Sequence, residues 1–539
     1  MKDIADIVIW SNSIFTATEK EPINGGIAIK DDKILNVGPK RQISPYISPN
    51  TKIISAYDKL VLPGFQDFHT HFWLGSLFEN NLNLSNCNSE QQIAKEVGRY
   101  ANENPNKDWI IGYGWHHVRW ENPNLPTKES LDKYVPDRPV LLINEEIHAA
   151  WLNTKALEIV NINEKTKNPP FGKIERNNYK QPTGFLHETA IGLVIKGVDL
   201  SINERRVIMD SFLNKVASYG ITSVSEIMTL PGFELGDLDL YADYEKNQKL
   251  TVRIYISTIL NDDLSQAKEF RDKYYSDKLM FSGLKQFIDG VPLTHTGYMI
   301  EPYTDVPNTR GETLYPKGTY FKWIQNADRL GFRIRLHACG DGAVRLALDA
   351  FEHAKNKNGI RDSRHAIEHV EVIHHEDIKR FKELNVIPSM QPRHMAAQSS
   401  KKINYLERLG IERYKRAWSI NSLHKSGANI IFGSDYPVVG LNPLLGIYHA
   451  VTRRHNDGLP KEGFNPTEKV SLADALSFYT KAPSYGNFQE NNIGSIESGK
   501  KADIIILNKD LFKVDHEEIK STKVICTIMD GKIIYQKKD

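Results

Sequence analysis

Residues 61–71 read VLPGFQDFHTH, a short apolar run that ends in two histidines, His69 and His71. An apolar run of this length followed by polar residues is typical of a buried strand. Side chains at positions i and i+2 of a strand point the same way, so both imidazoles can reach one metal ion. With 18 histidines in 539 residues, however, an H-x-H pattern is expected by chance about 0.6 times. Two polar loop histidines are the competing interpretation, so the motif needs support from the rest of the chain.

The run that ends at Phe68 is followed by seven others of the same kind. They end near Val224, Ile256, Ile288, Leu336, Ile367, Met390 and Phe432. From Val224 onward the gaps are about 20 to 50 residues, and a βα unit needs roughly 30. Eight runs at this spacing predict a TIM-like (β/α)8 barrel, hence an α/β fold. The gap from Phe68 to Val224 is too long for one helix and predicts an inserted subdomain.

Both ends of the chain are rich in strand-forming residues. Residues 6–15 (DIVIWSNSIF) and 524–529 (VICTIM) carry the β-branched and aromatic side chains that favour strands. The middle of the chain alternates apolar runs with helical stretches instead. The predicted boundaries are 1–60 and 490–539 for an accessory β-sandwich domain built from both termini, 61–489 for the barrel, and 75–205 for the subdomain inserted after barrel strand 1.

Several of the predicted barrel strands end in residues that bind metal ions. The fifth run ends in His337, the sixth in His369, and the eighth is followed by Asp435. In such barrels the catalytic residues lie at the C-terminal ends of the strands. A lone histidine after an apolar run is usually a capped or exposed residue. Four histidines and one aspartate at the ends of four runs indicate a metal site.

Three further charged residues fall inside predicted strands. Lys285 lies in the fourth run, where an unpaired ammonium group is costly and burial lowers its pKa. A neutral amine can take up CO₂ and become a carbamate that bridges two metal ions, whereas the alternative is a salt bridge to Asp289, four positions on. Arg333 and Arg335 share the strand phase of His337 and would point into the barrel, and the sequence offers no partner for them.

The composition narrows the function classes. Lys and Arg number 69 against 67 Asp and Glu, a net charge of +2, which offers no bulk field for nucleic acid or an anionic membrane. The three cysteines form no C-x-x-C pair and no disulfide framework. We find no signal-peptide pattern and no apolar run of 18 or more residues. We therefore expect a cytoplasmic protein that acts on a small molecule, and we leave homo-oligomerisation open.

The order and spacing of these motifs resemble the amidohydrolase superfamily, in particular its YtcJ-like branch, to which N-substituted formamide deformylase belongs. The resemblance covers nearly the whole chain. It rests on residues 63–71 (PGFQDFHTH), 284–290 (LKQFIDG), 337–341 (HACGD), 367–369 (IEH), 433–437 (GSDYP) and 494–503 (GSIESGKKAD). It implies a TIM barrel with an accessory β-sandwich and a metal-dependent hydrolase with one or two divalent ions, usually Zn²⁺.

The same resemblance assigns roles to the metal-type residues. It implies that His69, His71 and Asp435 hold a deeper ion and that His337 and His369 hold an outer one. Lys285, as a carbamate, would bridge the two ions. Unmodified lysine beside a single ion is the alternative, and Fe, Mn or Co are alternatives to zinc.

The expected activity is hydrolysis of a C–N bond in a small molecule, such as an amide, N-formyl or N-acyl group, by a metal-bound hydroxide. Asp435 would accept the hydroxide proton and return it to the leaving nitrogen. The alternatives are a deaminase, a cyclic amide hydrolase or a carbamate or ester hydrolase on the same site, and a non-catalytic barrel scaffold.

The substrate contacts are the least defined part of the prediction. Candidates are His148 and Trp115 in the insertion, and Asp289 and His295 after the fourth run. His148 packing the insertion and Trp115 lying in its core are the competing interpretations. Asp341 orients the metal shell or caps the helix that follows, and we favour the cap.

Overall fold

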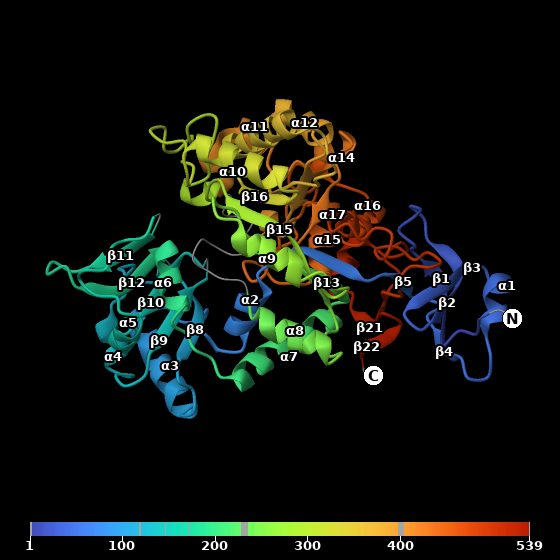
Figure 1. Cartoon of the computed structure of the whole chain (residues 1–539), viewed down its shortest axis with the longest axis horizontal. Helices are drawn as coiled ribbons and strands as arrows, with labels where there is room; N and C mark the ends of the chain where they lie inside the picture. The colour runs from blue at the N-terminus through green and yellow to red at the C-terminus, as the bar shows by residue number, and fades with distance from the viewer. Residues whose placement is uncertain are drawn as a thin grey trace. The chain divides into compact units, whose positions relative to one another are not determined.

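The computed structural model (Figure 1) describes residues 3–117, 120–145, 147–170, 172–227, 236–396 and 404–537. These residues fall into two compact units. The first comprises Met1–Thr70, Leu213–Ile227 and Tyr241–Asp539, and the second comprises His71–Phe212 and Met228–Leu240.

The first unit contains a nearly closed barrel of eight parallel strands, which run in the order β19-β18-β17-β16-β15-β14-β13-β6. Asp435 N–H donates to the His69 carbonyl at 2.7 Å, and Thr70 bridges to Tyr436, which brings the two edge strands together. The eight apolar runs of the sequence are these strands, so the predicted barrel is confirmed. The strands are β6 (Phe65–Thr70), β13 (Ile221–Ile227), β14 (Arg253–Ile259), β15 (Leu279–Phe287), β16 (Ile334–Ala338), β17 (Ala366–His369), β18 (Ile387–Met390) and β19 (Ile431–Phe432).

Helices connect the barrel strands, and α11 (Asp341–Asn358) shows why they form where they do. Val344, Ala347 and Phe351 recur at helical spacing and are buried, so one face of α11 packs inward. Gly359 ends the helix with a φ of +91°, a conformation that glycine adopts without steric cost. The other helices next to barrel strands include α7 (Ile202–Ser218), α8 (Leu238–Lys246), α9 (Ser265–Lys273), α10 (Lys317–Arg329), α12 (Ile378–Glu383), α13 (Asn404–Tyr414), α14 (Ile420–Lys425), α15 (Pro443–Thr452), α16 (Leu472–Phe478) and α17 (Lys481–Gly486).

Both termini contribute to one eight-stranded sheet, ordered β22-β21-β20-β5-β1-β2-β3, with β4 paired to β1. The antiparallel pair β5–β20 joins the two ends of the chain, and the blue and red strands lie side by side in Figure 1. The predicted packing of these strands as a sandwich stays a prediction. The strands are β1 (Ile7–Ile14), β2 (Ile23–Lys30), β3 (Lys33–Gly38), β4 (Lys52–Ser55), β5 (Leu60–Pro63), β20 (Ile504–Leu507), β21 (Val524–Met529) and β22 (Lys532–Gln536).

The second unit has its own six-stranded sheet, ordered β11-β12-β10-β9-β8-β7. Two apolar clusters form its core, one around Leu141 and Ile143 and the other around Trp115 and Trp151. The residues predicted as an insertion, 75–205, fall within this unit. Its strands are β7 (Leu82–Asn83), β8 (Ile110–Trp115), β9 (Val140–Asn144), β10 (Ala149–Leu152), β11 (Gly172–Arg176) and β12 (Pro182–Glu188), and α2 (Phe72–Glu79) and α3 (Glu90–Glu103) are among its helices.

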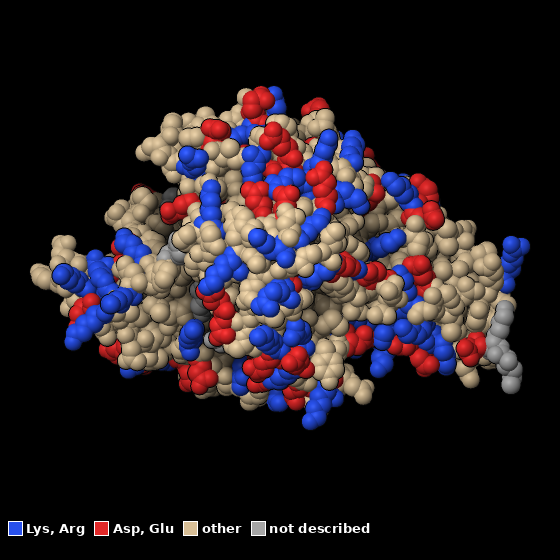
Figure 2. Space-filling view, turned by 45° about the horizontal axis from the view of Figure 1, so that its top comes forward, with Lys and Arg blue, Asp and Glu red and all other residues tan. Residues whose placement is uncertain are grey.

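Charged side chains of both signs share the surface. Figure 2 shows basic and acidic side chains interspersed over the face in view, and the net charge of the chain is +2. None of the helices in the described part of the chain combines the length and the apolar character needed to cross a membrane.

A buried arginine joins the barrel to the terminal sheet. Arg253, the first residue of β14, donates to Asp503 just before β20 and to Asp530 in the turn between β21 and β22. The guanidinium group is 1% exposed. A charge buried this deeply requires its partners, because removal of one partner leaves the other charge uncompensated.

We expect Arg253→Met to lower the free energy of unfolding by about 3–5 kcal/mol, because it leaves two carboxylates without their cation. Urea denaturation followed by circular dichroism measures this loss. Lys322→Met, which breaks the exposed pair with Asp262, is the matched control and should leave the denaturation midpoint unchanged. Equal midpoints for Arg253→Met and the wild type would contradict the role of this ion pair.

Candidate metal centre

Two groups of buried ligand-type side chains meet at the C-terminal ends of the barrel strands. His69, His369 and Asp435 form one group, and His337, Cys339 and His369 form the other. Within each group, one candidate ligand atom per residue lies within 4.8 Å of the others. His369 belongs to both groups, and its ring centre lies 5.0 Å from that of His69 and 4.3 Å from that of His337.

Local backbone conformation brings these side chains inward. His369 and Val370 have φ values of +75° and +47°, and Asp435 has a φ of +62°. Such values are rare for residues other than glycine, and each costs about 1–3 kcal/mol. Because Glu368 and His369 are neighbours, regular strand alternation would point them to opposite faces. The left-handed turn at His369 ends that alternation, and both side chains reach the centre of the barrel.

The loop that carries Asp435 packs directly on β6. A Cβ atom at Gly433 would lie 2.6 Å from the backbone nitrogen of His69, so this position requires glycine. Asp67 Oδ1 accepts the backbone N–H groups of His69 and Ser434 at 3.2 and 2.8 Å. These contacts hold His69 Nε2 at 3.2 Å from Asp435 Oδ1.

The buried carboxylate of Glu368 holds the His69 ring in place. Glu368 Oε2 lies 2.7 Å from His69 Nδ1, and Glu368 Oε1 accepts from Arg335 Nε at 2.6 Å. Burial acts to raise the pKa of Glu368, but Arg335 and His69 outweigh it and hold this pKa well below its usual range. With Nδ1 engaged by an ionised carboxylate, His69 turns Nε2 toward Asp435. Metal-bound histidines commonly hold their other ring nitrogen against a carboxylate in this way.

The two strand arginines thus find partners that the sequence did not reveal. Arg335 also donates to the Phe68 carbonyl and lies over the Phe68 ring. Arg333 donates to the Gly486 carbonyl and to the side chains of Ser282 and Asn487. Both arginines point into the barrel, as their strand phase predicts. Arg335 contacts the candidate metal centre through Glu368, which also bonds His69.

Lys285 is fully buried in β15 and does not pair with Asp289. In the part of the chain that the structure describes, Lys285 Nζ has no hydrogen-bond partner. The Asp289 carboxylate instead accepts the backbone N–H groups of Tyr298, Cys339 and Gly340, at 2.8 to 3.0 Å. Burial lowers the pKa of Lys285 to about 8. The salt-bridge alternative is therefore wrong, and the neutral amine is accessible near neutral pH.

Three other predicted site residues, His71, Trp115 and His148, belong to the second unit. His71 precedes α2 and is the first residue of the second unit, and its role as a ligand stays a prediction. His148 Nδ1 lies 2.7 Å from Glu188 Oε2, and Trp115 is buried against Trp120 and Trp151 in a core of the same unit.

Two of the predicted substrate contacts lie in the first unit. His295 Nε2 lies 3.0 Å from Asp305 Oδ2, and its ring packs edge-on against Tyr303. Burial raises the pKa of Asp289 to about 8, although three backbone N–H groups oppose this. The predicted cap at Asp341 is wrong, because Gly340 occupies the N-cap position and Asp341 is the first residue of α11.

Sequence reasoning missed His394. Its Nε2 lies 3.4 Å from Asp435 Oδ2, its Nδ1 lies 3.4 Å from Glu371 Oε1, and its ring stacks on His369. Burial acts to lower the pKa of His394, but the two carboxylates raise it to about 9. His394 comes four residues after the end of β18, beyond Pro392, whereas the predicted ligands were sought at the ends of the runs.

The buried atoms fit a divalent transition-metal ion. Imidazole nitrogens and a carboxylate are typical ligands of zinc and similar ions. His369 Nδ1 and Lys285 Nζ are buried and lack hydrogen-bond partners among the described residues, so an ion or a modification would satisfy them. Burial lowers the pKa of His337 to about 3, which leaves the neutral imidazole that binds metals.

A parallel barrel with this donor set at the C-terminal ends of its strands defines a metal-dependent hydrolase. The model of the amidohydrolase family matches residues 52–535. The chain therefore belongs to the amidohydrolase family, as the sequence motifs predict. Cys339, from the second ligand-type group, lies with its Sγ 3.4 Å from His337 Nε2.

Relatives span the whole chain. The protein LONG AFTER FAR-RED 3 of Arabidopsis thaliana is 29% identical over 99% of this chain and 92% of its own length. YtcJ of Bacillus subtilis, an amidohydrolase by name, is 28% identical over 98% of this chain and 99% of its own length. N-substituted formamide deformylase of Arthrobacter pascens is 23% identical over 100% of this chain and 99% of its own length.

Solved structures share the fold. A metal-dependent hydrolase from Pyrococcus horikoshii has a TM-score of 0.78 at 23% identity, covering 95% of this chain and 99% of that chain. An adenosine deaminase from Xanthomonas campestris with bound zinc has a TM-score of 0.55 at 13% identity, covering 99% and 94%.

We expect Glu368→Gln to weaken metal affinity about 10- to 100-fold, because the amide no longer holds His69 as an ionised carboxylate does. Competition with a chromogenic chelator measures the dissociation constant for Zn²⁺. Asp328→Asn is the matched control, since Asp328 forms a buried carboxylate–histidine pair with His365 at the opposite end of β17. Wild-type affinity in Glu368→Gln, or an equal loss in both variants, would contradict the positioning role.

Proposed function

We propose that the protein hydrolyses a C–N bond of a small molecule, such as an amide, N-formyl or N-acyl group. The observation that carries this proposal is the buried group of His69, His369 and Asp435 at the C-terminal end of the barrel, where such barrels place their active sites. The full-length similarity to an N-substituted formamide deformylase supports the choice of bond.

We propose Zn²⁺ as the resident ion, held by His69, His71 and Asp435, with His337 and His369 holding a second ion. The zinc bound to a deaminase of the same fold supports this choice. When bound, a divalent ion lowers the pKa of a water ligand to roughly 7 and polarises the substrate carbonyl. Lys285, whose pKa burial lowers to about 8, would bridge the ions as a carbamate formed from its neutral amine.

The proton steps fall to Asp435. Its Oδ1 lies beside His69 and its Oδ2 beside His394, so the carboxylate is held on both sides. Asp435 accepts the proton of the attacking water and returns it to the leaving nitrogen, which makes one group the base and then the acid. His394, held in turn by Glu371, keeps Asp435 in the orientation that both transfers need.

A panel of small amides tests the proposed bond. The zinc-loaded enzyme is incubated with N-formyl, N-acyl, cyclic amide, carbamate and amine substrates, and release of formate, carboxylate or ammonia is measured. Formate or carboxylate release from the open amides supports the proposal. Ammonia release from amines alone would make the protein a deaminase, and hydrolysis of carbamates alone would contradict the amide assignment.

We expect Asp435→Asn to lower kcat by about 10²- to 10⁴-fold, because an amide cannot accept and return the proton. Metal content, measured by elemental analysis, should remain at half or more of the wild-type value, since the histidine ligands are unchanged. Asp328→Asn again serves as the control for loss of a buried carboxylate. A fully active Asp435→Asn enzyme would exclude this residue as the proton carrier.

We expect Lys285→Ala to lower metal content, because the bridging carbamate is lost. A short carboxylic acid such as acetate or propionate should restore part of the activity by supplying the missing oxygen ligands. Lys278→Ala, on a partly exposed lysine just before β15, is the control and should keep both metal and rate. Full metal occupancy and full rate in Lys285→Ala would exclude a bridging role.

A further inference from the structure

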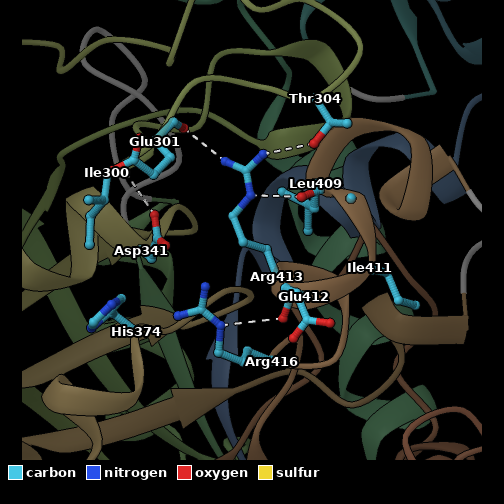
Figure 3. A pocket seen from close by; sticks show the side chains of 11 residues that line it. Ile300, Glu301, Thr304, Asp341, His374, Leu409, Ile411, Glu412, Arg413 and Arg416 are labelled. Carbon is cyan, nitrogen blue, oxygen red and sulfur yellow. Dashed lines mark hydrogen bonds between the residues drawn. The ribbon is translucent and has the colours of Figure 1, made fainter.

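A pocket lies near the C-terminal ends of the barrel strands, and none of the residues of the candidate metal centre lines it. Figure 3 shows this pocket, which has a volume of about 410 Å³ and so falls in the range of small-molecule sites. The loops after β16 and β17 contribute Asp341 and His374, and α13 and the residues after it contribute Leu409, Arg413 and Arg416. Its lining residues belong to neither metal-type group.

Arg416 supplies an unpaired cation to this pocket. Its Nη1 is buried and makes no hydrogen bond within the described ranges, and its Nε makes only a long contact of 3.5 Å with the Glu412 carbonyl. Arg413, by contrast, donates to the carbonyls of Leu409 and Glu301 and to the Thr304 hydroxyl. A buried guanidinium donor without a partner is costly, so Arg416 is the group that a ligand would satisfy.

His374 adds a neutral donor beside Arg416. Its Nδ1 accepts from Arg345 Nη2 at 2.9 Å, which leaves the hydrogen of the ring on Nε2. Burial and the nearby cations Arg345 and Arg416 lower the pKa of His374, so the ring stays neutral. Arg345 is itself held by Asp377 and Glu376, which fixes the orientation of His374.

The lining of the pocket also includes a hydrogen-bond acceptor and apolar side chains. Asp341 Oδ1 accepts the Ile300 N–H at 2.9 Å, and Oδ2 makes no hydrogen bond to any residue that the structure describes. Figure 3 shows the Asp341 carboxylate above His374 and Arg416 in the view. Ile300, Leu409 and Ile411 line the pocket between polar groups.

We propose that this pocket binds a small molecule that carries a carboxylate next to a hydrogen-bond donor and an apolar group, as an N-acyl amino acid does. The planar guanidinium group of Arg416 matches a carboxylate in a bidentate pair, and His374 Nε2–H adds a third donor. Asp341 Oδ2 accepts from the neighbouring N–H. A phosphate dianion is disfavoured relative to a carboxylate, because its second negative charge finds no further unpaired cation beyond Arg416 among the described lining residues and would be repelled by Asp341, Glu301 and Glu412, which line the pocket.

The test uses the full chain stripped of metal, so that binding does not depend on the proposed hydrolysis. Isothermal titration compares N-acetyl-leucine, its neutral amide N-acetyl-leucinamide, 4-methylpentanoic acid (which lacks the acylated amine and so the N–H donor) and inorganic phosphate. We expect N-acetyl-leucine to bind at least tenfold more tightly than its amide and than phosphate. Equal binding of the amide, tighter binding of phosphate, or no binding of N-acetyl-leucine up to 10 mM (about −2.7 kcal/mol) would overturn the proposal.

Variants then assign the contact. Arg416→Met should weaken N-acetyl-leucine at least tenfold, whereas Arg454→Met, which removes a cation paired with Glu517 outside the pocket, should bind it normally. Asp341→Asn should reduce the preference for N-acetyl-leucine over 4-methylpentanoic acid, which has no N–H to donate. Circular dichroism melting confirms that each variant is folded, and wild-type affinity in a folded Arg416→Met protein would overturn the assignment.

Discussion

The candidate metal centre depends on one buried carboxylate, Glu368. An ionised carboxylate with no access to water costs several kcal/mol unless both oxygens are engaged. Arg335 engages one oxygen and His69 the other, so the strands β6, β16 and β17 are joined at the depth where the ligand-type side chains meet. The same pairing selects the His69 nitrogen that faces Asp435. A stability requirement and a requirement of the site are therefore met by the same two contacts.

The surrounding backbone serves this arrangement. His369, Val370 and Asp435 take left-handed conformations that regular strands avoid, and they do so where a ligand-type side chain must turn toward the barrel axis. Gly433 and Asp67 hold the Asp435 loop on β6. Strain of this kind persists only where neighbouring contacts determine the conformation, which is consistent with a site that is preorganised before an ion or a substrate arrives.

Much of the fold could be predicted from the sequence, because apolar runs at regular spacing report buried parallel strands. The ligand-type residues His69, His337, His369 and Asp435 were predicted because they stand at or just after the ends of those runs. Glu368 was not identified, since strand alternation places it opposite His369 and only the left-handed turn brings both inward. His394 was missed because a loop, not a strand end, carries it to Asp435. The salt bridge between Lys285 and Asp289 was wrong as an alternative, because three backbone N–H groups already satisfy that carboxylate.

The central claim is that the buried histidines and Asp435 hold a metal ion. Anomalous diffraction from crystals of the zinc-loaded protein, collected above and below the zinc absorption edge, tests it most directly. The account predicts a zinc peak within about 2.0–2.2 Å of a nitrogen of His69 and of His71 and an oxygen of Asp435, with a second peak beside His337 and His369 if Lys285 is carboxylated. A hydrolytically active, zinc-loaded protein with no anomalous peak at these residues would contradict the account.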